Sequence, residues 1–82
     1  MLTLVNIIKN NDVIEADYIP ESSNYKAHIA LDLLTEEYSA ENIQEYGSMY
    51  SRMAANGLLR TVKELNEGKI TGIPEKRIVM WY

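Results

Sequence analysis

Residues 25–34 constrain the fold more than any other stretch, because their apolar side chains recur at every second position. One face carries Ala27, Ile29, Leu31 and Leu33, and the other carries Lys26, His28, Ala30 and Asp32. Successive side chains of a β-strand point to opposite faces of its sheet. We therefore expect a strand over residues 25–34, with one face against a core and the other in contact with solvent.

The sequence before this strand predicts a β-hairpin. Residues 2–9 and 12–19 are rich in Val, Ile and Leu, and Asn10 and Asn11 lie between them. Asn tolerates positive φ, so these two residues are expected at the centre of a tight turn. The expected pairs are then Lys9–Asp12, Ile7–Ile14, Val5–Ala16 and Thr3–Tyr18. This register directs Val5, Ile7, Ile14, Ala16 and Tyr18 toward the core.

Residues 48–67 predict the main helix. Ser48 is a favourable N-cap, and Gly68 follows where a C-terminal glycine is expected. An apolar stripe runs along the segment through Met49, Met53, Leu58, Val62 and Leu65. Gly57 lies at the inner edge of this stripe, where we expect it to allow close packing of the helix on the sheet.

Two further segments complete the expected fold. Residues 77–82 predict a final strand, docked in the sheet through its aromatic end. Residues 35–47 leave two possibilities: a turn followed by a short strand, which we favour, or a short helix over residues 39–46 capped by Ser39. Together these elements predict a single α+β domain over residues 1–82, with an antiparallel sheet of three to five strands covered by one main helix.

Length and composition restrict the number of domains, the kinds of stabilising site and the cellular location that we expect. The 82 residues leave no room for a second core, and there is no cysteine to form a disulfide or a thiolate metal site. Residues 1–8 are apolar but lack the basic region of a signal peptide. No apolar run approaches the ~20 residues that span a bilayer. We expect a soluble cytoplasmic protein without membrane contacts.

Charge is distributed unevenly along the chain. Residues 1–50 hold nine acidic and two basic residues, whereas residues 51–82 hold three acidic and six basic residues. We favour a basic helix and tail packed against an acidic sheet, with most charges solvated. The alternative is an acidic patch that engages a basic partner. No concentrated cluster of Lys and Arg residues is present in the sequence, so we expect no nucleic-acid binding.

Few residues are candidates for chemistry. His28 is the only histidine, and the expected register places it opposite Asp17 on the outer face. The pair is either a general base with its orienting carboxylate or, as we favour, a surface cross-strand pair. The acidic residues Glu36, Glu37, Glu41 and Glu45 lack the spacing of a cation-binding loop. We expect no metal and no cofactor.

Aromatic side chains give the strongest functional indication in the chain. Six tyrosines and one tryptophan are present without any phenylalanine, so every aromatic side chain has a polar group. Tyr and Trp are enriched in protein interfaces for this reason. The candidate interface residues are Tyr38, Tyr46, Tyr50, Trp81 and Tyr82.

Three segments carry a resemblance to a known family. They are Ile-Glu-Ala-Asp-Tyr-Ile-Pro-Glu at residues 14–21, Ile-Pro-Glu-Lys at 73–76 and Val-Met-Trp-Tyr at 79–82. The chain resembles a family of small bacterial proteins, mostly Gram-positive, that open with a strand hairpin and have no established activity. Residues 35–47 depart from the glycine-containing turn of that pattern. The resemblance therefore implies no functional residues for this chain.

These observations lead to a ranked set of functions. We favour a non-enzymatic protein-interaction module that self-associates as a dimer, or binds an unidentified protein, through an edge strand or its tyrosine-bearing surface. The second hypothesis is a small-ligand or catalytic site around His28 and Asp17. The third is an acidic inhibitor that imitates nucleic acid, which requires carboxylates in a regular array on one surface.

Overall fold

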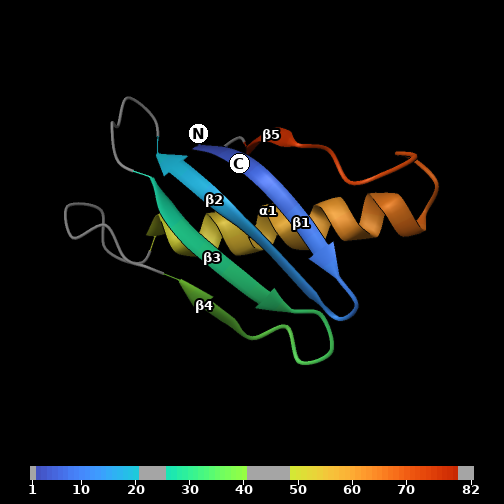
Figure 1. Ribbon diagram of the computed structural model, residues 1–82, viewed down its shortest axis with the longest axis horizontal. Coiled ribbons are helices and arrows are strands. Elements are labelled where there is room, and N and C mark those ends of the chain that lie inside the picture. Colours follow the sequence, from blue (N-terminus) through green and yellow to red (C-terminus); the bar gives the residue numbers. More distant parts are fainter. Residues whose placement is uncertain (1, 21–25, 41–48, 80–82) are drawn as a thin grey trace.

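A five-stranded antiparallel sheet packs against a single helix (Figure 1). The computed structural model describes residues 2–20, 26–40 and 49–79. The strand order across the sheet is β4-β3-β2-β1-β5. The elements are β1 (Leu2–Asn10), β2 (Val13–Pro20), β3 (Ala27–Asp32), β4 (Tyr38–Ala40), α1 (Met49–Asn66) and β5 (Lys76–Val79). The expected α+β architecture is confirmed.

Helix α1 covers one face of the sheet, and no helix of the described segments covers the other (Figure 1). The core lies between the helix and the covered face, and it includes Leu4, Ile14, Tyr18, Ile29 and Leu58. We call the uncovered side the open face. Its strand residues are Thr3, Val5, Asn6, Ile8, Asn10, Val13, Glu15, Asp17, Ile19, His28, Ala30, Asp32, Ser39, Lys76 and Ile78.

Strand β3 has the orientation that its alternating sequence predicts. Ala27, Ile29 and Leu31 are buried against the helix. Ile29 pairs with Ala16, and His28 pairs with Asp17 on the open face. Because every second position of β3 is apolar without interruption, only one orientation buries all of them. Both expected pairs are confirmed.

The expected register of the first hairpin is wrong, because the turn lies one residue later and β1 contains a β-bulge. Asn10 pairs with Val13, so Asn11 and Asp12 form the turn, with Asn11 at φ 51°. The pairing then shifts between Val5 and Ile8, which leaves two residues of β1 opposite Ala16 alone.

This bulge reverses the side-chain alternation along β1. Asn6 adopts φ 54° at the bulge, in the left-handed region that Asn tolerates better than most residues. Leu2 and Leu4 before the bulge and Ile7 after it all reach the core. Val5, which we expected to face the core, lies instead on the open face opposite Asp17. Thr3, which we expected to pair with Tyr18, lies on the same face opposite Ile19.

The bulge gives a direct prediction at Asn6. We expect Asn6→Ala to be less stable than Asn6→Gly by about 1 kcal/mol, because alanine is disfavoured at positive φ and glycine is not. Both variants lose the hydrogen bond from Asn6 Nδ2 to Asp17 Oδ2, so the comparison isolates the backbone effect. Urea unfolding measures the difference. Equal stabilities would contradict the left-handed conformation at Asn6.

Helix α1 ends as predicted. Gly68 adopts φ 76°, its N–H donates to Leu65 O, and the N–H of Lys69 donates to Glu64 O. This is the Schellman arrangement that a glycine after the last turn favours. Ser48, the expected N-cap, lies outside the described residues. The exposed side of the helix carries Arg52, Asn56, Arg60, Lys63 and Glu67, as expected.

Gly57 brings the helix close to the sheet. A Cβ atom at this position would lie 2.6 Å from Val79 Cγ2 and 3.2 Å from Leu4 Cδ1. The close approach predicted for Gly57 is therefore present, and its contacts are with β5 and β1.

A polar network that the sequence did not indicate joins the same half of the helix to β5. Arg77 donates one hydrogen bond to Thr61 Oγ1 at 3.1 Å and others to the Glu64 carboxylate. The Thr61 hydroxyl, which is fully buried, donates in turn to Gly57 O at 2.8 Å. This hydrogen bond is the i−4 back-bond that Thr often forms inside helices.

The residues between β3 and Ala40 form a turn and a short strand, as we favoured. Asp32 Oδ1 accepts hydrogen bonds from the N–H groups of Leu34 and Thr35, which closes the β3–β4 loop. Strand β4 then pairs with β3 through Ile29–Ala40 and Leu31–Tyr38. The alternative helix would have begun at residues that belong to β4, and residues 41–48 lie outside the described segments. The final strand is described over Lys76–Val79, and residues 80–82 also lie outside.

Candidate functional site

The expected pair of His28 and Asp17 forms on the open face. His28 Nδ1 lies 3.0 Å from Asp17 Oδ1, and His28 Nε2 lies 4.0 Å from Glu15 Oε2. Strands β2 and β3 position these side chains, because Asp17 pairs directly with His28 and Glu15 is the next β2 residue on the same face. Each ring nitrogen of the histidine therefore has a carboxylate neighbour.

The Asp17 carboxylate is stabilised in its ionised form. Its hydrogen bond with His28 lowers the pKa of Asp17 most, and the Asn6 amide and the Lys26 ammonium, 3.9 Å away, lower it further. Partial burial opposes these effects without cancelling them. The result is a pKa below the ordinary value of 3.8.

This shift predicts an acid-dependent effect of one substitution. Because the folded protein holds the Asp17 pKa below its unfolded value, the ionised carboxylate stabilises the fold above that value, and the contribution disappears as pH falls through the folded pKa. We expect Asp17→Asn to lower the free energy of unfolding at about pH 6 and to have a smaller effect at about pH 2.5. Urea unfolding at both pH values tests this, and an equal loss at both would contradict it.

The geometry supports one kind of chemistry at this cluster. A histidine oriented by a carboxylate can accept a proton from a ligand on its other nitrogen. Here that nitrogen faces Glu15, and the His28 side chain is less than half exposed. Among the described residues no set of three or more His, Asp or Glu side chains is arranged to hold a metal ion.

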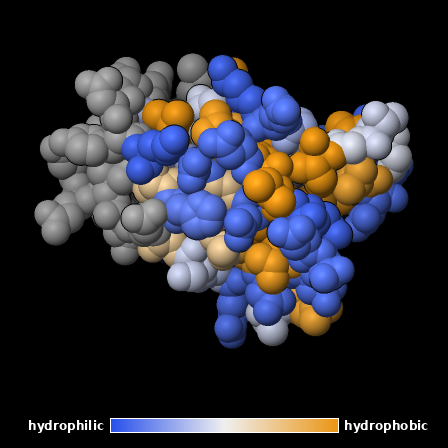
Figure 2. All heavy atoms as spheres, in the orientation of Figure 1, coloured by the Kyte–Doolittle hydropathy of each residue, from blue (hydrophilic) through white to orange (hydrophobic). Residues whose placement is uncertain are grey.

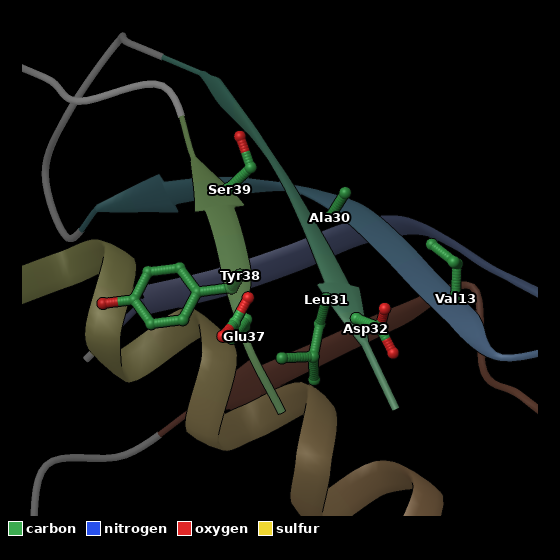
Figure 3. A pocket seen from close by; sticks show the side chains of 7 residues that line it. All are labelled: Val13, Ala30, Leu31, Asp32, Glu37, Tyr38 and Ser39. Carbon is green, nitrogen blue, oxygen red and sulfur yellow. The ribbon is translucent and has the colours of Figure 1, made fainter. Parts of the chain in front are cut away.

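A second feature lies at the end of the sheet that contains the β1–β2 turn and the β3–β4 loop. An open pocket of about 310 Å³ is lined there by Val13, Ala30, Leu31, Asp32, Glu37, Tyr38 and Ser39. In Figure 3 Leu31 extends toward the helix, whereas Ala30 and Ser39 extend to the open face. A hydrogen bond from Leu33 N–H to Asp12 O joins the two loops beside the pocket. We call this region the pocket end.

The aromatic residues proposed for an interface have different surroundings. Tyr38 lines the pocket and is 40% exposed. Tyr50 is only 7% exposed and belongs to the core, so its ring offers little surface to a partner. Tyr46, Trp81 and Tyr82 lie outside the described residues. Of this group, the structure therefore places only Tyr38 on the described surface.

Sequence reasoning found the polar cluster and missed the pocket. Strand alternation places Asp17 and His28 on one face and allows them to pair, whereas the pocket requires the exact ends of β2, β3 and β4. One signal was available: Asp32 followed by Leu34 and Thr35 is a sequence that favours an Asx turn.

Comparisons with known proteins add no relative to this picture. Neither a scan of protein-family models nor searches of curated proteins and solved structures found a match. The resemblance to small bacterial proteins therefore stays a prediction. The described part of the chain has no helix that is long and apolar enough to cross a membrane.

Proposed function

We propose that the protein is a non-enzymatic protein-interaction module that contacts its partner through the open face. The observation that carries this proposal is the exposure of large apolar side chains on a sheet face that no described helix covers. Ile8 is 50% exposed, Ile78 is 54% exposed and Val13 is 38% exposed. Figure 2 shows hydrophobic residues interspersed with hydrophilic ones on this side of the molecule.

Exposed apolar side chains contribute favourable free energy when a partner removes them from water. Fully burying one Val, Leu or Ile side chain is worth about 1.5–3 kcal/mol, so a partner that covers Ile8, Val13 and Ile78 gains binding free energy from each. A small domain also buries a small fraction of its surface by folding, so a partner that covers the open face would add to its stability. The partner is another protein or a second copy of this chain.

A pull-down tests the proposal. The bait carries its tag at Met1 and is incubated in native lysate of cells that express the untagged protein, and mass spectrometry quantifies what is retained. The open-face variant is Ile8→Thr/Val13→Thr/Ile78→Thr, in which the substitutions keep the β-branched shape of each side chain. The control is Arg60→Gln on the exposed side of α1. Circular dichroism confirms that each bait is folded.

Each result of the pull-down either supports or overturns the proposal. We expect a protein, or the untagged copy of this chain, that the wild type and Arg60→Gln retain in stoichiometric amount and the open-face variant loses. Recovery of the untagged copy alone would assign the partner as a second copy. Equal recovery by all baits, or no stoichiometric protein with any bait, would overturn the proposal.

A second candidate function rests on the 3.0 Å contact between His28 and Asp17. In this alternative His28 accepts a proton from, or hydrogen-bonds, a small ligand on the open face. NMR titration of the His28 ring in the wild type and in Asp17→Asn, with and without a library of small polar metabolites, tests it. A ligand that shifts the His28 resonances in the wild type and fails to do so in Asp17→Asn would favour this function over the interaction module.

A further inference from the structure

We propose that the partner segment carries an apolar side chain flanked by lysine or arginine residues, and that it binds at the pocket end. This inference rests on the proposed interaction function and specifies its site and the chemistry of its partner. Two independent features of the pocket end support it: a concentration of exposed apolar side chains, and a surrounding set of carboxylates.

Exposed apolar residues gather at this end of the sheet. The large hydrophobic residues that the described surface exposes are Ile8, Val13, Leu34, Tyr38 and Ile78. All except Ile78 lie on the strands and the loop at the pocket end. Leu34, at the tip of the β3–β4 loop, is 75% exposed. Val13 and Tyr38 also line the pocket itself. Val13 and Ala30 line it from the open face, whereas Tyr38, paired with Leu31, extends to the helix side (Figure 3). An apolar side chain inserted from the open face would therefore contact Val13 and Ala30.

Carboxylates surround the same apolar residues. Asp32 and Glu37 line the pocket. Glu15 pairs with Ala30, which is another lining residue, while Asp12 and Glu36 are adjacent in sequence to Val13 and Glu37. We call this set the acidic rim; it consists of Asp12, Glu15, Asp32, Glu36 and Glu37. Lys9 is a basic residue at this end, and its Nζ donates to Asn11 O at 3.0 Å.

The acidic rim selects the charge of the partner. Carboxylates around an apolar contact favour basic flanking residues and repel acidic ones, and they also raise the association rate of a cationic segment. A purely apolar segment would bury the pocket without neutralising the rim. An apolar anchor with basic neighbours satisfies both features, which is why we favour this chemistry.

Two described elements of the chain itself, α1 and β5, have part of this chemistry. The exposed side of α1 carries Arg52, Arg60 and Lys63, but no described residue of the helix is an exposed large hydrophobic. Strand β5 presents Ile78 beside Lys76, at the opposite edge of the sheet from β4. A second copy that docked this strand at the pocket end would bring the exposed Glu75 toward the acidic rim, and its Arg77 is already bonded to Glu64. We therefore assign the site to a different protein.

Selection from a random peptide library displayed on phage tests the inference, with the immobilised full chain as target. We expect the enriched peptides to combine Leu, Ile, Val or an aromatic residue with at least two Lys or Arg residues. Fluorescence anisotropy then measures the affinity of the enriched peptides for the wild type and for matched variants. One pair compares Val13→Thr with Ile78→Thr, and the other compares Glu37→Lys with Glu75→Lys. Each pair introduces the same new residue at two exposed positions, one inside and one outside the pocket end.

The expected results are specific to the site. Val13→Thr should weaken binding by about fivefold and Glu37→Lys by about tenfold at low salt, from the lost apolar burial and the reversed charge. Ile78→Thr and Glu75→Lys should leave the affinity within about twofold, and added salt should reduce the effect of Glu37→Lys.

Several outcomes would overturn the inference. They are no enrichment, enrichment of acidic or uncharged peptides, or affinities that depend on Ile78 and Glu75 in place of Val13 and Glu37. In each case a partner that depends on the open face in the pull-down would leave the interaction function standing. Retention of only the untagged copy, abolished by Ile78→Thr, would replace the foreign partner with a second copy.

Discussion

Leu4→Ala is expected to lower the free energy of unfolding by about 2–5 kcal/mol, which is the usual range for a fully buried leucine. Leu4 is 0% exposed, and its Cδ1 would lie 3.2 Å from a Cβ atom added at Gly57 of the helix. The expectation depends on the bulge at Asn6, because a regular strand in the register that the sequence suggested would have turned Val5 into the core in place of Leu4. Equilibrium unfolding in urea measures the loss.

The matched control is Val5→Ala in the same strand. Val5 lies on the open face and is half-buried, so its loss should change the free energy of unfolding by about 1 kcal/mol or less. A larger effect at Val5 than at Leu4 would contradict the bulge and restore the uninterrupted alternation.

Gly57→Ala is expected to destabilise the protein by up to about 2 kcal/mol, although alanine is the better helix former. Helix propensity alone would favour alanine by about 1 kcal/mol. The added Cβ would lie 2.6 Å from Val79 Cγ2, and overpacking of this kind costs about 1–3 kcal/mol. Valine has a stiff, branched side chain, so it cannot withdraw without a shift of β5.

A second substitution separates the two effects at Gly57. In a Val79→Ala background both Val79 methyl groups near the new Cβ are absent, and the nearest remaining contact is the one with Leu4 Cδ1 at 3.2 Å. Gly57→Ala should then be neutral or stabilising by up to about 1 kcal/mol. A thermodynamic cycle of the four proteins measures this coupling. If Gly57→Ala stabilises both backgrounds equally, the close approach of helix and sheet is wrong.

The parts of the fold that could be predicted are those in which local and tertiary preferences agree. Strand β3 has an uninterrupted alternation, and the helix has a continuous apolar stripe that ends at Gly68. In both cases a single orientation turns the apolar stripe toward the core, so periodicity determines which face is inside. The alternation places His28 and Asp17 on the same face and allows the pairing that the structure shows.

The first hairpin could not be predicted in the same way, because its alternation is interrupted. Leu2 and Leu4 are in one phase and Ile7 is in the other, and both phases expose some apolar residue in an ideal strand. The physical signal was Asn6, a residue that tolerates positive φ at the point where the phase changes. Weighing Asn6 as a bulge residue would have placed Leu4 in the core.

The two parts of the candidate site, the polar cluster and the pocket end, also differ in how far alternation could predict them. The polar cluster depends on two regular strands, β2 and β3, whose alternation places Asp17 and His28 on one face. The pocket end depends on where β2 begins, where β3 ends and how Asp32 closes the loop to β4. Periodicity carries no information about those ends. The Arg77 network was missed for a related reason, since a basic residue on a short edge strand is usually solvated.

The most direct test of the account is to map where a bound partner contacts the protein. The ¹⁵N-labelled full chain is titrated with the protein captured in the pull-down, or with an enriched peptide, and amide shifts are followed by NMR. We predict that the largest shifts occur at Val13, Ala30, Glu37, Tyr38 and Ser39, with little change along the exposed side of α1. Shifts concentrated at Arg52, Arg60 and Lys63 would place the partner on the helix and contradict an interaction module that works through its open face.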